Sequence, residues 1–311
     1  DLKFIGPKAE TIDLMGSKEH AREQMKKSGV PVVPGSEGCV DNADQARAAA
    51  RKIGYPVLLK AAAGGGGKGI RRVENDRDLT RIFNEAQNEA RISFGDGRMY
   101  LERVKHIEVQ VFRDQKGHAV CFPERDCSIQ RGKQKLIEES PCPVITPPER
   151  KNLQEIALQA LRGIDYENTG TLEFLMDQDH HFYFIEMNTR IQVEHTVTES
   201  VTGIDLVKEQ VRVAAGLPLS FKQDDIKVNG HAIECRINAE DPRQNFLPQT
   251  GRVDYLYLPA GNPGARIDTD IYSGAKITPF YDSMIAKVIA HGRTRREAIE
   301  KVKRLLQEMV I

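Results

Sequence analysis

A glycine-rich loop between two short apolar segments is the feature that most restricts the fold of this chain. The run GGGGKG, Gly64–Gly69, follows the segment 55–60 and precedes the strand-like segment Ile70–Val73. A dinucleotide-binding fold needs a helix directly after such a loop, and a P-loop needs Ser or Thr after its Lys, where a glycine stands here. We therefore predict a strand–loop–strand flap whose bare amides approach phosphate oxygens, with Lys60 and Lys68 as the nearby cations. A solvated surface hairpin is the alternative.

Composition and charge narrow the class of protein. The 311 residues carry 45 basic and 45 acidic side chains, so the net charge is zero. The molecule as a whole therefore does not attract the negative charges of a nucleic acid or a membrane surface. The five cysteines contain no CxxC pair and indicate reduced thiols in a cytosol-like compartment. No apolar run approaches the ~20 residues that cross a bilayer. Because the chain opens at Asp1 without Met, we expect it to be a piece of a longer protein.

The order of the predicted elements favours an α+β fold over a doubly wound parallel sheet, because strands follow one another as hairpins. Ser17 is a predicted helix N-cap, and Thr146-Pro147-Pro148-Glu149 is a predicted capping box. Further helices are predicted at 41–53, around 79–86, at 204–215 and around 298–306. Strands are predicted at 55–60, 70–73, 99–104, 107–111, 118–122, 171–176, 182–187 and 231–237.

Polar and apolar residues alternate through the segment 184–195. The polar positions are Glu186, Asn188, Arg190, Gln192 and Glu194. If the segment is extended, period two places all five on one face. A solvated edge strand is the alternative. On the functional interpretation Arg190 clamps an oxyanion and Glu194 is a candidate general base.

A predicted hairpin adds a metal site at one end of that face. A two-residue loop at Asp179-His180 would place Glu173 directly opposite Glu186. Two facing carboxylates repel unless a cation lies between them, and Asn188 adds a neutral oxygen on the same face. Two carboxylates and an amide are typical oxygen ligands for Mg²⁺ that bridges nucleotide phosphates.

Taken together, several segments closely resemble biotin carboxylase, a family of the ATP-grasp superfamily. They are Lys60 with the GGGGKG flap, 124–131 (ERDCSIQR), 184–195 (FIEMNTRIQVEH), 234–242 (ECRINAEDP) and 281–284 (YDSM). The resemblance implies an ATP-grasp fold with a small α/β lid and a larger antiparallel-sheet domain, without the family's N-terminal domain. It implies a linker and helix at 1–31, a lid at 32–104 and a central and truncated C-terminal domain at 105–311.

The resemblance also implies an activity and its partners. ATP and bicarbonate would form carboxyphosphate, and the carboxyl group would pass to N1′ of biotin on a carrier protein or domain. ATP and Mg²⁺ or Mn²⁺ are the implied cofactors. A carboxyltransferase subunit or domain, a homodimer and a cytoplasmic or organelle-matrix location are implied as well, as in acetyl-CoA carboxylase of fatty acid biosynthesis. No nucleic acid or membrane partner is expected.

Matching motifs assign the expected site residues. ATP contacts are expected from Lys18, Lys60, Gly66, Gly67, Glu102, His106, Gln130, Lys133, Glu173 and Glu186. Metal ligands are expected at Glu173, Glu186 and Asn188, and bicarbonate contacts at Lys135, Arg190, Gln192 and the backbone of Val193. Glu194 matches the base, and Arg236 matches the residue that stabilises the biotin enolate. Lys133 departs from the family's usual His, and the segment between Glu102 and His106 is shorter than usual.

Two rival functions stay open on the sequence. One is another ATP-grasp ligase that forms an acyl phosphate for an amine, without biotin. The other is an inactive nucleotide-binding fragment. The contexts of Glu194 and Arg236 favour biotin carboxylation over both.

Overall fold

The computed structural model describes residues 2–32, 40–53, 57–61, 70–73, 75–102, 105–131, 134–177 and 179–311. The flap glycines, Gly66 and Gly67 among them, and Lys133 lie outside the described residues. The chain divides into two compact units. One unit comprises 1–30, 107–173 and 186–311, and the other comprises 31–106 and 174–185. No helix in the described part of the chain is both long enough and apolar enough to cross a membrane.

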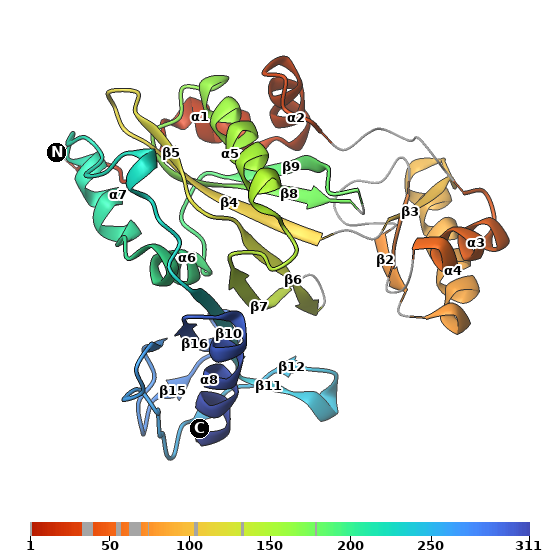
Figure 1. Ribbon diagram of the computed structural model, residues 1–311. Helices are drawn as coiled ribbons and strands as arrows, with labels where there is room; N and C mark the ends of the chain where they lie inside the picture. Colours follow the sequence, from red (N-terminus) through yellow and green to blue (C-terminus); the bar gives the residue numbers. More distant parts are fainter. Residues whose placement is uncertain are drawn as a thin grey trace. The chain divides into compact units, whose positions relative to one another are not determined.

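The smaller unit contains a three-stranded antiparallel sheet in the order β2-β1-β3 (Figure 1). Its strands are β1 (Val57–Ala61), β2 (Ile70–Val73) and β3 (Met99–Glu102), and its helices are α3 (Ala43–Ile53) and α4 (Asp76–Phe94). Asn75 begins α4 by accepting hydrogen bonds from the next turn, and left-handed Gly95 ends it. Phe83 and Leu79 on α4 pack with Leu59 and Val73 of the sheet in one core, as the helical spacing predicted.

A longer antiparallel sheet has nine strands in the described part of the chain. Eight follow the order β14-β16-β10-β7-β6-β4-β8-β9, and β5 pairs with β4. The strands are β4 (Lys105–Arg113), β5 (Ala119–Cys121), β6 (Arg125–Arg131), β7 (Gln134–Ser140), β8 (Asn168–Met176), β9 (Phe182–Asn188), β10 (His231–Asn238), β14 (Ala265–Thr269) and β16 (Met284–Gly292). Short two-residue strands form the pairs β11 (Glu240–Asp241) with β12 (Leu247–Pro248) and β13 (Gly251–Arg252) with β15 (Lys276–Ile277).

Helices of the larger unit are α1 (Ala9–Gly16), α2 (Lys18–Lys27), α5 (Pro147–Arg162), α6 (His195–Thr202), α7 (Leu206–Ala214) and α8 (Arg295–Glu308). Two predicted helix starts are confirmed. Ser17 accepts a hydrogen bond from the His20 amide at the start of α2. The Glu149 carboxylate accepts from the Thr146 amide at 2.7 Å in the capping box of α5.

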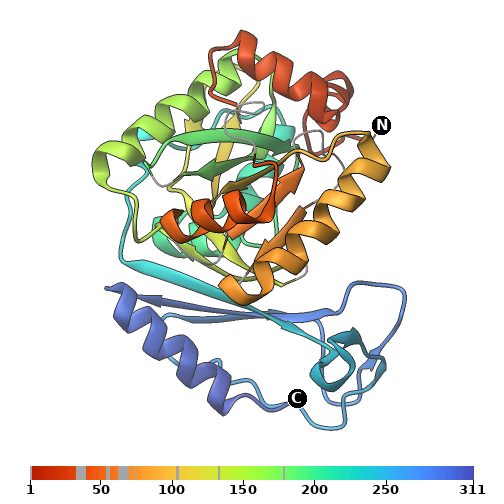
Figure 2. The same ribbon diagram turned by 90° about the vertical axis from the view of Figure 1, so that its right-hand side faces the viewer.

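The two faces of β10 and β16 pack against different helices. Ile233 and Cys235 share a core with Val288 and with α8, which lies along these strands in both views (Figures 1 and 2). The alternate residue Ala232 packs instead with Val197 of α6. Because side chains alternate across a strand, the even-numbered residues of β10 therefore point to the α6 face. Glu234 and Arg236 are on that face.

The structure corrects two local predictions. Strand β9 ends at Asn188, and residues 189–194 form bends and a turn, so the polar residues 186–194 do not share one extended face. The hairpin turn closes where the Asp177 amide donates to the His181 carbonyl at 3.1 Å, so the two-residue loop at Asp179-His180 is wrong. The reason is local: His180 adopts a left-handed φ of 61°, and the Asp177 carboxylate accepts the amides of Asp179 and His181.

Candidate active site

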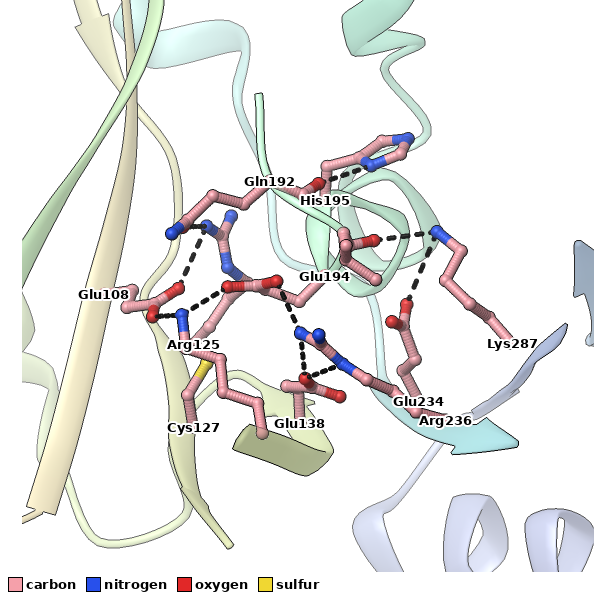
Figure 3. A network of polar contacts seen from close by, with 12 residues as sticks. Glu108, Arg125, Cys127, Glu138, Gln192, Glu194, His195, Glu234, Arg236 and Lys287 are labelled. Carbon is pink, nitrogen blue, oxygen red and sulfur yellow. Dashed lines mark hydrogen bonds and ion pairs between the residues drawn. The ribbon is translucent and has the colours of Figure 1, made fainter. Parts of the chain in front are cut away.

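A buried carboxylate held by two cations forms the centre of the site. Glu194 is only 1% exposed and occupies the N-cap position of α6, directly after the turn that follows β9. Its Oε1 lies 2.7 Å from Nζ of Lys135 on β7, and its Oε2 lies 2.9 Å from a terminal guanidinium nitrogen of Arg236 on β10. Figure 3 shows Arg236 between Glu194 and Glu138. Three elements far apart in sequence thus converge on one carboxylate.

Acidic neighbours stabilise the charge of both cations. Burial acts to lower the pKa of Lys135, but the carboxylates of Glu108 and Glu194 outweigh it and raise that pKa. Burial likewise opposes ionisation of Arg236, and Glu138 and Glu194 raise its pKa. Both side chains are therefore fixed positive charges beside Glu194, which is the environment that an anionic substrate requires.

Arg125 on β6 organises the floor of the site. Its side chain is fully buried and ion-paired with Glu108 at 3.3 Å. One terminal nitrogen donates to Gln110 and Thr198 at 3.0 and 3.1 Å, and the other approaches Gln192 at 3.4 Å. A guanidinium with several fixed acceptors orients them at once, because its donors lie in one rigid plane.

The predicted metal ligands contribute an oxygen-rich corner. Glu173 on β8 is buried, and its Oε1 accepts from Nδ2 of Asn188 at 2.7 Å and from Nε2 of Gln192 at 2.9 Å. Glu186 lies two residues before Asn188 on β9 and is half-buried. Carboxylate oxygens and an amide oxygen are ligands that suit Mg²⁺. A flip of the Asn188 side chain, which exchanges its amide oxygen and nitrogen, turns that oxygen toward Glu173. Glu173 and Asn188, which are in contact, therefore fit the ion, and the place of Glu186 opposite Glu173 stays a prediction because the two-residue loop behind it is wrong.

The expected bicarbonate residues are only partly brought together. Lys135 lies 3.6 Å from Oε1 of Glu173, the oxygen that Gln192 also contacts. The Val193 carbonyl accepts from Nζ of Lys287 at 2.7 Å. Arg190 is exposed, and among the described residues its guanidinium contacts only the Ile191 carbonyl, at 3.1 Å. Because β9 ends before Arg190, this side chain is exposed whereas Gln192 and Glu194 are buried.

The expected nucleotide residues are distributed over both units. Gln130 is on β6, where its amide donates to the Cys127 carbonyl at 2.9 Å. Lys60 is on β1 of the smaller unit, and His106 is the second residue of β4. Lys18 is the first residue of α2 and Glu102 the last of β3. The assignment of these residues to ATP stays a prediction.

Several charged residues of the network were not predicted from the sequence. They are Glu108, Arg125, Glu138, Glu234 and Lys287, all with a side chain at most 11% exposed. A signal existed for Glu108, because polar and apolar residues alternate along residues 107–111 as they do in the segment 184–195. For Arg125 the sequence holds no such pattern, since its burial depends on partners from four other segments.

Two of these carboxylates have strongly perturbed proton affinities. Burial, followed by repulsion from Glu234, raises the pKa of Glu138. Burial raises the pKa of Glu234 as well, against the opposing effects of Lys287 and Thr196. By contrast, Glu139 is paired with His231 and Arg295, whose hydrogen bonds outweigh burial and lower its pKa. The pKa values of two adjacent carboxylates on β7 are thus shifted in opposite directions, because their side chains lie on opposite faces of the sheet.

Comparison with known proteins decides the family. Residues 17–222 match the family described as carbamoyl-phosphate synthase L chain, ATP binding domain, and residues 234–311 match the biotin carboxylase C-terminal domain. The chain is 50% identical over its whole length to biotin carboxylase 1 of Bacillus subtilis, of which it covers 70%. The chain belongs to the biotin carboxylase family.

Two further relatives extend the comparison. The chain is 50% identical over 99% of its length to the biotin carboxylase of Haemophilus influenzae, of which it covers 69%. The biotin carboxylase domain dimer of Hydrogenobacter thermophilus 2-oxoglutarate carboxylase, solved with MgADP, ADP and bicarbonate, aligns with a TM-score of 0.78 at 47% identity. That alignment covers all of this chain and 69% of the solved chain. The α+β ATP-grasp fold expected for the family is confirmed.

Proposed function

We propose that this chain carboxylates biotin in two steps, with ATP and bicarbonate as the other substrates and Glu194 as the base of the first step. The observation that carries the assignment is the position of Glu194, buried between Lys135 and Arg236 at 2.7 and 2.9 Å. A base has to lie within hydrogen-bond reach of the proton that it removes. A bicarbonate attracted by Lys135 would lie at that distance from Glu194.

In the first step an oxygen of bicarbonate attacks the γ-phosphorus of ATP, and the bond from that phosphorus to ADP breaks. The bicarbonate proton passes to Glu194, and carboxyphosphate results. Lys135 offers a fixed positive charge at the place where the bicarbonate anion binds, and Gln192 is held by Arg125 and Glu173 in a defined orientation beside it. Positioning of this kind supplies much of the barrier reduction in phosphoryl transfer.

The metal-binding corner fits the nucleotide end of this reaction. Glu173, Glu186 and Asn188 would hold Mg²⁺, which when bound neutralises charge on the nucleotide phosphates. Gln192 links this corner to the bicarbonate end, since its amide donates to Glu173 while its backbone precedes Glu194 by two residues. The solved relative from Hydrogenobacter contains MgADP and bicarbonate together, and this supports the same combination here.

Arg236 serves the second step. Its guanidinium is fixed by Glu138, with Nε 2.7 Å from the carboxylate, while a terminal nitrogen faces Glu194. In this step the bond between carbon and the bridging oxygen of carboxyphosphate breaks, the phosphate released takes up the N1′ proton of biotin, and N1′ bonds to the carbon. Negative charge develops on the ureido oxygen as N1′ loses its proton, and a preorganised cation is worth about 3–4 kcal/mol at such a position. We assign Arg236 to that oxygen.

The remaining assignments follow the family. Lys18, Lys60, Gly66, Gly67, Glu102, His106, Gln130 and Lys133 are proposed ATP contacts. The segment 32–104 is proposed to close over ATP as a lid, because a labile intermediate has to be protected from water. Relatives include components of pyruvate and 2-oxoglutarate carboxylases, so the carboxylation of biotin is the step they share. A biotin carrier, a carboxyltransferase and a second copy of the chain are the proposed partners.

A turnover assay tests the proposal against its rivals. Purified protein is supplied with MgATP, bicarbonate and free biotin, and release of ADP is measured with each substrate omitted in turn. Biotin carboxylation predicts ADP release that rises with both bicarbonate and biotin, together with fixation of labelled bicarbonate. ADP release that needs an amine in place of biotin would indicate an acyl-phosphate ligase. Nucleotide binding without turnover would indicate an inactive fragment.

A further inference from the structure

Glu138 on β7 and Glu234 on β10 lie opposite each other on the face of the sheet that also carries Arg236. They are direct partners in the register of β7 on β10, and both are fully buried. Directly opposite residues of an antiparallel pair have Cβ atoms about 4.5–5.5 Å apart, so two carboxylates there repel when both are ionised. Figure 3 shows the two side chains on adjacent strands, with Arg236 reaching past Glu138 toward Glu194.

Each of these carboxylates has one oxygen that is satisfied and one that is not. Oε1 of Glu138 accepts from Arg236, and Oε2 of Glu234 accepts from the hydroxyl of Thr196. Among the described residues, Oε2 of Glu138 and Oε1 of Glu234 are buried without a hydrogen-bond partner. Each such oxygen costs stability unless a donor reaches it. A single proton placed between these two oxygens would make one of them a donor and satisfy both.

Among the residues that the structure describes, no second cation is in close contact with the pair. Arg236 is divided between Glu138 and Glu194. Lys287 on β16 is 4.0 Å from Glu234, and its ammonium is nearer to Asp268 on β14, at 3.6 Å, and to the Val193 carbonyl. At the start of α6 the neighbours are Thr196 and the further carboxylate of Glu194. A buried pair of acids in these surroundings is stabilised by sharing one proton.

We propose that Glu138 and Glu234 share one proton and act as positioning residues that keep Arg236 directed at Glu194. With the proton present, the pair carries one negative charge, and the guanidinium divides its donors between Glu138 and Glu194. When the proton is lost, a second buried anion competes for the same guanidinium and draws it away from Glu194. The raised pKa of each acid supports this arrangement. The functional consequence rests on the role proposed above for Arg236.

The shared proton can be detected without any turnover. A protonated carboxyl group gives an infrared C=O band that is separate from the bands of ionised carboxylates and that shifts in deuterium oxide. We expect such a band in the unsubstituted protein at neutral pH, and we expect it to disappear as the pH is raised. It should be absent in Glu234→Gln and in Glu138→Gln. It should persist in the control Glu139→Gln, because Glu139 is the next residue on β7 and its pKa is lowered.

Turnover then tests the positioning role. The amide of Glu234→Gln can donate to Glu138, whereas Glu234→Ala offers no donor, so biotin-dependent turnover at neutral pH should fall more in Glu234→Ala than in Glu234→Gln. The decline of that turnover on the alkaline side should move to higher pH in Glu234→Gln and stay in place in Glu139→Gln. If the pair only stabilised the fold, the pH at which turnover declines would be the same in Glu234→Gln and in the unsubstituted protein.

Two results would overturn the inference. One is an infrared spectrum in which Glu234→Gln and Glu138→Gln lose no C=O band. The other is an alkaline decline that is the same with and without Glu234. If a variant fails to fold, the pH titration of the band in the unsubstituted protein decides the matter, and absence of that band refutes the shared proton. Failure of the proposed function is distinct, because it would appear as an absence of biotin-dependent turnover in the unsubstituted protein.

Discussion

Replacing Lys135 by Met should expose how strongly the central carboxylates depend on one ammonium group. Nζ of Lys135 lies 2.7 Å from Glu194, contacts Glu108 and lies 3.6 Å from Glu173. At an effective dielectric constant of about 20, one charge pair at 2.7 Å is worth about 6 kcal/mol. The desolvation of the ammonium disappears with it, so the net loss in free energy of unfolding should be about 3–5 kcal/mol.

The assay is urea unfolding of Lys135→Met and of the unsubstituted protein at pH 7 and at pH 5. Without the ammonium, Glu108 and Glu194 keep Arg125 and Arg236 as ion-pair partners, but the buried cluster carries one more unbalanced negative charge. A cluster with excess negative charge is destabilised less at lower pH, where binding of protons is favoured. The difference in free energy of unfolding should therefore be smaller at pH 5. The control is Lys116→Met at an exposed position, which should change stability by less than about 0.5 kcal/mol. Equal effects of the two substitutions, or a loss that does not depend on pH, would refute the reasoning.

Three further predictions concern other parts of the site. Glu173→Ala and Glu186→Ala should each weaken binding of the magnesium nucleotide, measured by calorimetry, and unchanged affinity in both would exclude the proposed metal corner. Arg236→Met should reduce biotin-dependent ADP release by about 10²–10³-fold, as for loss of one donor to a developing anion, while nucleotide affinity persists; equal losses of both would contradict its role. Glu139→Gln should cost about 1.5–3 kcal/mol at neutral pH. Because the folded-state pKa of Glu139 is lowered, its contribution is present above the unfolded pKa and is lost as the pH falls, so unfolding curves that differ equally at neutral and acid pH would count against it.

The helices and strands that could be predicted from the sequence are those determined by residues close together in the chain. The capping box at Thr146 and Glu149 determines the start of α5 with little help from tertiary structure, and the spacing of Leu79 and Phe83 places α4 against its sheet. The segment after Asn188 was predicted as a strand because polar and apolar residues alternate there. In the structure residues 189–194 form bends and a turn. Gln192 and Glu194 belong to a buried polar network and not to one face of a strand.

The site was recognised through its motifs, whereas its supporting network required three-dimensional information. Glu194, Lys135 and Arg236 were expected to act together and do converge. The acids behind them, Glu138 and Glu234, are buried because β7 and β10 pair in one register, and pairing between strands nearly a hundred residues apart has no signature in one sequence. When only the sequence is known, an acidic residue is expected at the surface, since acids are seldom fully buried unless they are paired.

The most direct test of the account is bicarbonate-dependent ADP release by Glu194→Gln, measured together with ATP affinity. The account predicts a loss of turnover of about 10²–10⁴-fold, the usual contribution of a general base, with ATP still bound. Glu209→Gln is the matched control and should retain turnover, because Glu209 is also buried but lies on α7, where its carboxylate accepts from the Ser220 hydroxyl. Turnover of Glu194→Gln equal to that of the control would contradict the central claim.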